Sequence, residues 1–251
     1  MFKKLALFCC CLSLFLLAGC GSTQKVDNTQ VASYPGWIQV NAGQQASFSV
    51  PPELAEESQE YVTAQLQKED LNPLLRKWLT EDQITGKSAG CVIAQTTDVT
   101  ALPWEGDNHY ARVEFKTMPT PEKLPKYGQN LGLKAAEIKD FGDITQKALT
   151  GMAQKDLPEG YSLNFHDWQP MKSVIINGVE SLYTSYEEDV VYQNKLQVTF
   201  HVERWTFFNR DRVHTLTVTS RKQDKAYWED ESRPLYKKLV NTLKITASEA
   251  K

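Results

Sequence analysis

The chain has 251 residues, of which 41% are hydrophobic and 24% charged, and its formal net charge at pH 7 is −3. This acidic balance argues against a nucleic-acid partner, which would need a basic face, and the length suits one ordinary domain or two small ones. No long low-complexity stretch divides the sequence, so we expect a single domain.

The first residues have the pattern of an exported protein. Lys3 and Lys4 precede an apolar stretch over 5–17, which has the length of a signal-peptide core and is too short to span a bilayer as a helix. The stretch ends in LAGC at 17–20, which resembles the lipobox of bacterial lipoproteins. We therefore predict a lipoprotein signal peptide over 1–19.

The lipobox resemblance implies that the chain is cut before Cys20 and that the thiol of this residue carries a diacylglycerol. Two or three acyl chains would make membrane attachment effectively permanent. The alternatives are an ordinary signal peptide with a chance cysteine, or an uncleaved anchor. We expect a lipid-anchored protein on the extracytoplasmic side of a bacterial cell membrane. Gly21 stands where an aspartate would favour the inner membrane, and the choice between inner and outer membrane is open.

Three further segments follow the signal peptide. Residues 20–36 are polar and without apolar periodicity, which is typical of a flexible tether. The folded domain is expected over 37–246, and 247–251 should form a frayed tail. With Cys20 lipidated, Cys91 is the remaining cysteine, and its place at the start of CVIAQTT indicates a buried strand thiol rather than a reactive one.

The first half of the domain mixes short strands with helical stretches. The expected strands lie at 37–40, 46–50, 90–97 and 109–117. A stretch of helix formers covers 53–80, and Pro73 is suited to the first turn of a second, short helix there. Another helical section is expected over 120–155, with an interruption near 141–143.

The last hundred residues predict an antiparallel meander. Four β-rich runs are joined by short turns, among them Asn177-Gly178 and 209–211. In the third run, Val198, Phe200 and Val202 have one parity while Trp205 and Phe207 have the other. Either a bulge intervenes or both sheet faces are covered.

A terminal helix is expected to cover one face of this meander. Asp224 is a suitable cap, and Pro234 should kink or restart the helix. Its apolar residues recur at spacings of one or two turns: Trp228, Leu235, Leu239 and Leu243. Ile245 ends the apolar pattern.

The chain resembles the PsbP-like superfamily, which includes DcrB-type envelope lipoproteins. The resemblance rests on FSVPPEL near the start, the turn at Asn177-Gly178-Val179-Glu180, the long hairpin and the final LVNTLKI, and it covers about 37–246. It implies an α+β fold in which an antiparallel β-sheet packs between helices, as an α/β/α sandwich. Members of the family mostly serve as accessory or adaptor proteins.

Two catalytic patterns overlap in GKSAG at 86–90. The sequence fits G-x-S-x-G with Ser88 as nucleophile, but such an elbow needs a strand before the serine and a helix after it, and here the order is reversed. Gly86-Lys87-Ser88 also matches the end of a phosphate-binding loop, yet Glu81 stands where another glycine is required. A surface turn explains the segment without chemistry.

The β-hairpin near the C-terminus offers a metal-site pattern. His201 and Glu203 share one strand face, and the paired strand could bring His214 near them. Strand register decides this: if the turn centres on residues 210 and 211, Phe207 faces His214 and His201 lies far along the ribbon. Arg210 and Arg212 could contact phosphate, although a solvated hairpin tip is the better explanation.

Aromatic residues are frequent in the meander and could line a ligand groove, form a partner surface or fill the core. They are Trp168, Tyr183, Tyr186, Tyr192, Trp205, Phe207 and Phe208. We expect them in the core between sheet and helices.

We therefore expect a membrane-anchored, non-catalytic binding or adaptor domain for an envelope protein partner. It would be held to the membrane through lipidated Cys20 and have no nucleic-acid partner. We assign no catalytic residue, metal ion or cofactor, and ligand-binding residues stay unassigned. The alternatives are a small-ligand-binding lipoprotein and an envelope hydrolase that uses Ser88.

Overall fold

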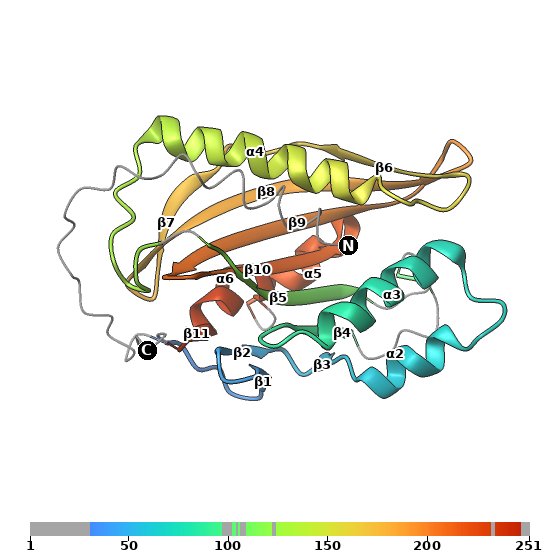
Figure 1. Ribbon diagram of the computed structural model, residues 1–251. Coiled ribbons are helices and arrows are strands. Elements are labelled where there is room, and N and C mark those ends of the chain that lie inside the picture. The colour runs from blue at the N-terminus through green and yellow to red at the C-terminus, as the bar shows by residue number, and fades with distance from the viewer. Residues whose placement is uncertain are drawn as a thin grey trace.

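The computed structural model describes residues 31–246, apart from 97–101, 104, 106–108, 122–123 and 232–233. Within these residues, two antiparallel sheets and several helices form the layers shown in Figure 1. The structure confirms the predicted α+β class, with an antiparallel sheet packed between helices. None of the helices in these ranges is long and apolar enough to cross a membrane.

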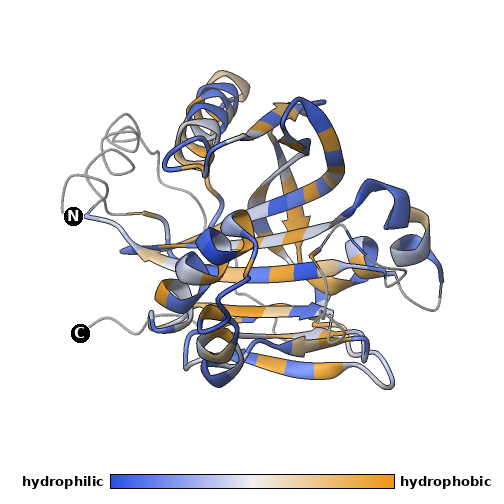
Figure 2. Ribbon diagram, turned by 90° about the vertical axis from the view of Figure 1, so that its right-hand side faces the viewer, coloured by the Kyte–Doolittle hydropathy of each residue, from blue (hydrophilic) through white to orange (hydrophobic). Residues whose placement is uncertain are grey.

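The large sheet has the strand order β3-β4-β5-β10-β9-β8-β6, and β7 also pairs with β8. Its strands are β3 (Leu54–Glu56), β4 (Val92–Thr96), β5 (Ala111–Pro119), β6 (Tyr161–His166), β7 (Lys172–Ile176), β8 (Val179–Tyr192), β9 (Lys195–Asn209) and β10 (Arg212–Arg221). The small sheet has the order β1-β2-β11, with strands β1 (Ile38–Ala42), β2 (Ala46–Val50) and β11 (Lys244–Ile245). Hydrophobic and hydrophilic residues alternate along many of these strands (Figure 2).

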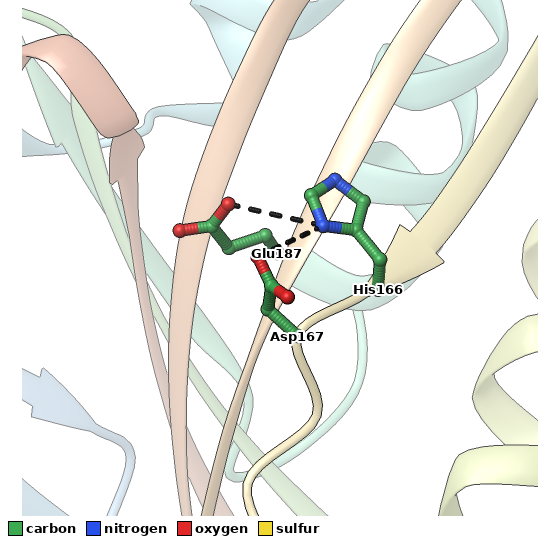
Figure 3. Close-up of side chains that lie close together, drawn as sticks. All are labelled: His166, Asp167 and Glu187. Atoms are coloured by element: carbon green, nitrogen blue, oxygen red, sulfur yellow. Dashed lines mark hydrogen bonds and ion pairs between the residues drawn. The ribbon is translucent and has the colours of Figure 1, made fainter.

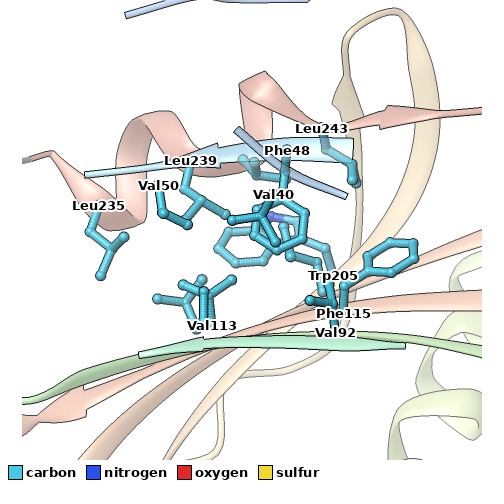
Figure 4. Packing of buried hydrophobic residues seen from close by; sticks show 14 of the residues in the cluster. Val40, Phe48, Val50, Val92, Val113, Phe115, Trp205, Leu235, Leu239 and Leu243 are labelled. Carbon is cyan, nitrogen blue, oxygen red and sulfur yellow. The ribbon is translucent and has the colours of Figure 1, made fainter. Parts of the chain in front are cut away.

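The large sheet has two faces with different coverings. The small sheet and the C-terminal helices pack on one, which we call the hairpin face; it carries Val113, Phe115 and Trp205. Figure 4 shows these residues meeting the small sheet. The helices α3 and α4 pack on the opposite face, which we call the helix face; Phe200 and Val202 belong to it.

The segment predicted as helical over 53–80 is only partly helical. Leu54–Glu56 forms β3, which pairs with β4. The side chain of Leu54 is fully buried in the hairpin-face core, and this packing stabilises the strand. Two helices follow, α2 (Gln59–Leu66) and α3 (Pro73–Gly86). Pro73 opens α3 as predicted, and the Asn72 side chain accepts hydrogen bonds from the first-turn N–H groups. The second helix is longer than expected and continues to Gly86.

The second helical section begins later than predicted and is not interrupted. It forms α4 (Ala135–Ala153), which runs through the glycine that suggested a break. Gly142 is tolerated because the helix lies close to the sheet connection there: a Cβ at this position would lie 3.0 Å from the Cβ of Met171. Phe141 beside it is buried, and this packing offsets the low helix propensity of glycine.

The meander is present, with its first run split into the two strands β6 and β7. Asn177 and Gly178 both have positive φ, as the predicted tight turn between β7 and β8 requires. The change of parity in β9 reflects two covered faces, since Phe200 and Val202 lie on the helix face and Trp205 on the hairpin face. The pairing of β8 with β9 does contain a register shift, but it lies at Val190 and Val191 of β8, away from the change of parity.

The C-terminal helix is broken into short pieces: the 3₁₀ turn η2 (Lys222–Asp224), α5 (Lys225–Glu229), α6 (Leu235–Lys238) and the 3₁₀ turn η3 (Leu239–Thr242). The four apolar residues predicted for its inner face are all buried in the hairpin-face core. Asp224 precedes α5 but makes no side-chain cap; its carboxylate bonds Arg221 instead. Ile245 is not the end of a helix but part of β11, which pairs with β2.

Part of the segment predicted as a tether contacts the folded body. The amide of Ala32 donates to the carbonyl of Asn241 at 2.9 Å. The ring of Tyr34 lies 5.0 Å from that of Trp37, and the ammonium of Lys238 lies 5.1 Å above it. The predicted signal peptide, Cys20 and the predicted tail at 247–251 lie outside the described residues.

Candidate functional site

Ser88 lies in an exposed turn between α3 and β4, so a helix precedes it and a strand follows, as the sequence indicated. Its hydroxyl donates to the carbonyl of Ile84 at 3.1 Å. In the described part of the chain no histidine contacts this hydroxyl. Within the described residues, Ser88 therefore has no histidine base in contact with it.

The three candidate metal ligands of the C-terminal hairpin do not meet. Phe207 pairs with His214, as the predicted turn requires, whereas His201 pairs with Ser220. His201 and Glu203 do contact each other, with 3.3 Å between Nε2 and Oε1. His214 is separately buried, and its Nδ1 lies 2.9 Å from the hydroxyl of Thr117.

Most of the meander aromatics belong to the core. Tyr186, Trp205, Phe207 and Phe208 are buried, and Trp168 stacks on Tyr186 with 4.1 Å between the ring centroids. Tyr183 and Trp205 also contact each other across β8 and β9. The predicted packing role is therefore the correct one for these residues.

Cys91 and the arginine pair have ordinary surroundings. The thiol of Cys91 is half-buried just before β4, 3.9 Å from the carbonyl oxygen of Thr117, and burial raises its pKa. A thiol with a raised pKa is a poor nucleophile.

Arg210 and Arg212 flank Asp211 at the tip of the β9–β10 hairpin, as expected.

A polar cluster that the sequence analysis missed lies on the hairpin face, at the end of β6. We call it the His166 cluster: His166, Asp167, Glu187, Asp189 and Lys222. Nδ1 of His166 lies 3.2 Å from Asp167 Oδ2 and 3.9 Å from Glu187 Oε2 (Figure 3). Nε2 lies 3.2 Å from Asp189 Oδ1, and Lys222 Nζ lies 2.6 Å from Glu187 Oε2.

The arrangement of the His166 cluster favours positive charge at its centre. The hydrogen bond with Asp189, and then that with Asp167, raises the pKa of His166. One nitrogen and two carboxylate oxygens, from His166, Asp167 and Glu187, lie within 4.8 Å of one another and form a donor set that could hold a divalent cation. The cluster can therefore hold a proton or a cation, while Lys222 already neutralises one of its carboxylates.

A second polar site lies on the helix face, under α2 and α3. Arg112 of β5 donates two hydrogen bonds, of 2.7 and 2.6 Å, to the buried carboxylate of Asp82 of α3. This pair lines a hollow of about 380 Å³, together with the aromatic residues Tyr61, Trp78 and Tyr110. An aromatic wall with a fixed ion pair at one side suits a small, partly apolar ligand.

Glu57 adds a titratable group beside this ion pair. Burial, and then the nearby Asp82 carboxylate, raises the pKa of Glu57 to about 7. Its Oε2 accepts a hydrogen bond of 2.5 Å from the amide of Gln95. The charge of this carboxyl group therefore changes near neutral pH.

Part of the His166 cluster could have been predicted from the sequence. Glu187 and Asp189 alternate along a β-run, which places both carboxylates on one face. The missing information was the partner strand: β6 pairs with this part of β8, and His166 faces Glu187 in the register. Asp167 follows with φ of 52°, a left-handed conformation that the sequence did not reveal.

Comparison with known proteins adds little to these observations. No protein-family model matches the sequence, and no curated protein sequence matches it. The solution structure of the cyanobacterial PsbP of Synechocystis sp. PCC 6803 is similar at 11% identity and a TM-score of 0.42, over 92% of this chain and 99% of that one. A Pseudomonas aeruginosa protein of unknown function is similar at 18% identity and a TM-score of 0.36, over 63% of this chain and 84% of that one.

At these TM-scores the likeness transfers neither a partner nor an activity to this chain.

Proposed function

We propose that the chain is a lipid-anchored lipoprotein of the bacterial cell envelope whose folded part is a non-catalytic domain that binds an envelope protein partner. The observation that carries the proposal is LAGC at 17–20, at the end of the apolar stretch. Acylation of Cys20 would hold the domain at the membrane surface, since each buried methylene contributes about 0.8 kcal/mol.

Two observations support binding rather than catalysis. The hydroxyl of Ser88 is used in a local hydrogen bond to Ile84 and follows a helix instead of a strand, which weighs against the hydrolase alternative. The sequence also resembles the PsbP-like superfamily. Members of this family are mostly accessory or adaptor proteins, which favours binding over catalysis.

The His166 cluster is the surface that we propose for contact with the partner. Asp167 exposes 65% of its side chain there, and three carboxylates face the single ammonium of Lys222. A partner with a basic surface would complement this excess of negative charge, and such complementarity speeds association and favours the correct partner.

A small-ligand-binding lipoprotein is the second candidate. The observation in its favour is the hollow of about 380 Å³ beside Asp82 and Arg112, which has the size of a small-molecule site. Ligand binding there and a protein partner at the His166 cluster do not exclude each other, because the two sites are on opposite faces of the large sheet.

The anchor is tested by expressing Cys20→Ala in the native host. We expect the parent protein in the membrane fraction and the variant as a precursor or a soluble form. Cys91→Ala is the matched control, because it removes the other cysteine that remains after cleavage, and it should stay with the membrane. A Cys20→Ala variant that has lost residues 1–19 and still stays fully in the membrane fraction would contradict the anchor.

The partner is tested by placing a photo-crosslinking residue at position 167 in intact cells. A second protein carries the same residue at position 211, at the exposed hairpin tip, and serves as the control. We expect a discrete crosslinked protein from position 167 and none from position 211. No crosslinked protein from either position, or the same product from both, would argue against the His166 cluster as the contact surface.

A further inference from the structure

Three side chains of the His166 cluster have the donor atoms of a metal-binding site. His166, Asp167 and Glu187 each place one possible ligand atom within 4.8 Å of the other two. Among the described residues, no other three histidine, cysteine or carboxylate side chains come so close together. The set differs from an ordinary group of surface acids, because one donor is an imidazole nitrogen that faces two carboxylates (Figure 3).

The separations between these donors suit a tetrahedral ion. Zn²⁺ holds imidazole nitrogen and carboxylate oxygen at about 2.0–2.1 Å, which places neighbouring ligand atoms about 3.4 Å apart. Nδ1 of His166 lies 3.2 Å from Oδ2 of Asp167, so this pair already has the required separation. The distance from Nδ1 to Oε2 of Glu187 is 3.9 Å, and it would need to shorten by about half an ångström.

Two paired strands hold the three donors in place. His166, at the end of β6, lies directly opposite Glu187 of β8 in the register, and Asp167 follows it in the chain. The Cβ atoms of such a cross-strand pair are about 5 Å apart, which lets the two side chains reach a common ion. Because the donors are carried by or adjoin regular strands, the site needs little reorganisation when an ion binds.

The other ring nitrogen of His166 has the neighbour that a metal-bound imidazole commonly has. Nε2 lies 3.2 Å from Oδ1 of Asp189, and the same oxygen accepts a hydrogen bond of 2.6 Å from the hydroxyl of Thr199 on β9. A carboxylate beside Nε2 favours the ring proton on that nitrogen and leaves the lone pair of Nδ1 for an ion. Asp189 is therefore a positioning residue that acts through His166.

The donors are open to solvent, and an ammonium group competes for one of them. The side chains of His166 and Asp167 are 38% and 65% exposed, so a hydrated ion can reach them. Nζ of Lys222 lies 2.6 Å from Oε2 of Glu187, the oxygen that faces His166. Lys222 is 54% exposed and can turn into water when an ion takes this oxygen, since an exposed ion pair costs little to break.

We propose that the His166 cluster binds Zn²⁺ through Nδ1 of His166, Oδ2 of Asp167 and Oε2 of Glu187, with water in the fourth position. An imidazole ligand favours Zn²⁺ over Mg²⁺ and Ca²⁺, which prefer oxygen ligands alone. The site should therefore discriminate between these ions. The proposal goes beyond the protein partner and does not depend on it, because it concerns the chain by itself.

The test uses the full chain, purified in detergent and freed of metal with a chelator, with Zn²⁺ alone as the probe. Calorimetry measures the affinity, and the imidazole ¹⁵N signals of His166 show which ring nitrogen binds. We expect saturable Zn²⁺ binding, a shift of the Nδ1 signal and a proton that stays on Nε2. Mg²⁺ and Ca²⁺ should bind at least about tenfold more weakly.

Variants locate the ion. His166→Gln and Asp167→Asn should each weaken Zn²⁺ binding by about tenfold or more. His109→Gln is the control, because it removes another partly exposed imidazole that lies beside a carboxylate, and it should leave the binding unchanged. Lys222→Met should tighten the binding by up to about fivefold, since it removes the ammonium that competes for Glu187.

The gain expected from Lys222→Met separates a metal site from damage to the fold, which could only weaken binding. Three results would overturn the proposal. They are no saturable Zn²⁺ binding below about 1 mM, binding that is unchanged in both His166→Gln and Asp167→Asn, and weaker binding by a folded Lys222→Met variant. The crosslinking experiment at position 167 tests the protein partner separately, so failure of one proposal is distinguishable from failure of the other.

Discussion

The two faces of the large sheet are built from the same strands, yet they carry different residues. On β5, Val113 and Phe115 point into the hairpin-face core, while Arg112, Glu114 and Lys116 alternate with them on the helix face. Along β5, the hairpin face is thus packed by apolar side chains. The helix face combines apolar packing with partly buried charges, so its stability should depend on pairing and on pH.

A row of polar residues crosses the helix face. Thr184, Arg204, Thr217 and Glu114 are neighbours in the register of β8, β9, β10 and β5. Arg204 donates to Thr217 at 3.4 Å, and burial lowers its pKa. The row separates the apolar cluster around Phe200 from the apolar cluster around Phe208. Among the described residues, the helix face therefore has two small apolar clusters, whereas the hairpin face has one large cluster.

The largest effect is expected from a charge placed in the hairpin-face core. Leu239 is fully buried there, and Leu239→Asp should lower the free energy of unfolding by about 4 kcal/mol, because it buries an unpaired carboxylate. Urea unfolding measures this. Leu196→Asp is the control, since Leu196 is 59% exposed and should tolerate the charge. Similar midpoints for Leu239→Asp and the parent would show that this core does not depend on the C-terminal segment.

The next effect concerns the ion pair of the helix face. Arg112→Met should cost about 3 kcal/mol, because it leaves the Asp82 carboxylate buried without its partner. Replacing both residues, as Asp82→Leu with Arg112→Met, should recover most of this loss. A double variant as unstable as the single one would mean that the hydrogen-bonded pair is itself stabilising and does more than neutralise a buried charge.

Glu188 provides a pH test of the helix face. Burial raises its pKa to about 7, above the 4.5 of an exposed glutamate, so the folded state prefers the protonated acid. This stabilisation is complete below pH 4.5 and is lost as the pH rises through 7. Glu188→Gln should therefore be more stable than the parent at pH 8.5, by about 1 to 2 kcal/mol, and equal to it near pH 4.

Thermal unfolding across this pH range is the measurement, with Glu105→Gln as the control. A Glu188→Gln variant that follows the parent's pH dependence would show that Glu188 is not buried as a neutral acid.

The smallest effect is expected where α3 begins. Asn72 Oδ1 accepts from Leu74 N–H at 2.9 Å, and its Nδ2 donates to the hydroxyl of Tyr161 at 2.8 Å. Asn72→Ala should cost about 1 to 2 kcal/mol, since it removes a helix cap and a link to β6. Tyr161→Phe keeps the cap and removes the link, and should lose about half as much. Chemical unfolding of both variants separates the two contributions, and equal losses would assign the whole effect to Tyr161.

Local patterns predicted those elements whose form is decided by neighbouring residues. The Asn177-Gly178 turn, the start of α3 at Pro73 and the two covered faces of β9 all follow from short-range chemistry or parity. The strand at 54–56 was missed because its conformation depends on pairing with β4, whose residues are distant in the sequence. The uninterrupted α4 was missed because Gly142 is compensated by packing against Met171.

The candidate sites were harder to predict, because they join residues from separate strands and turns. His166 meets Glu187 and Asp189 only through the β6–β8 register. The hollow beside Asp82 and Arg112 likewise joins residues of α2, α3 and β5. The order of helix and strand around Ser88 could be predicted from the local sequence, but the sequence had no means of placing these distant side chains together.

The proposed membrane anchor is tested most directly by mass spectrometry of the N-terminal peptide from the protein extracted from native membranes. The account predicts a mature chain that begins at Cys20 and carries the mass of a thioether-linked diacylglycerol, with or without a further acyl group on the amine. An unmodified chain that begins at any other residue would contradict it.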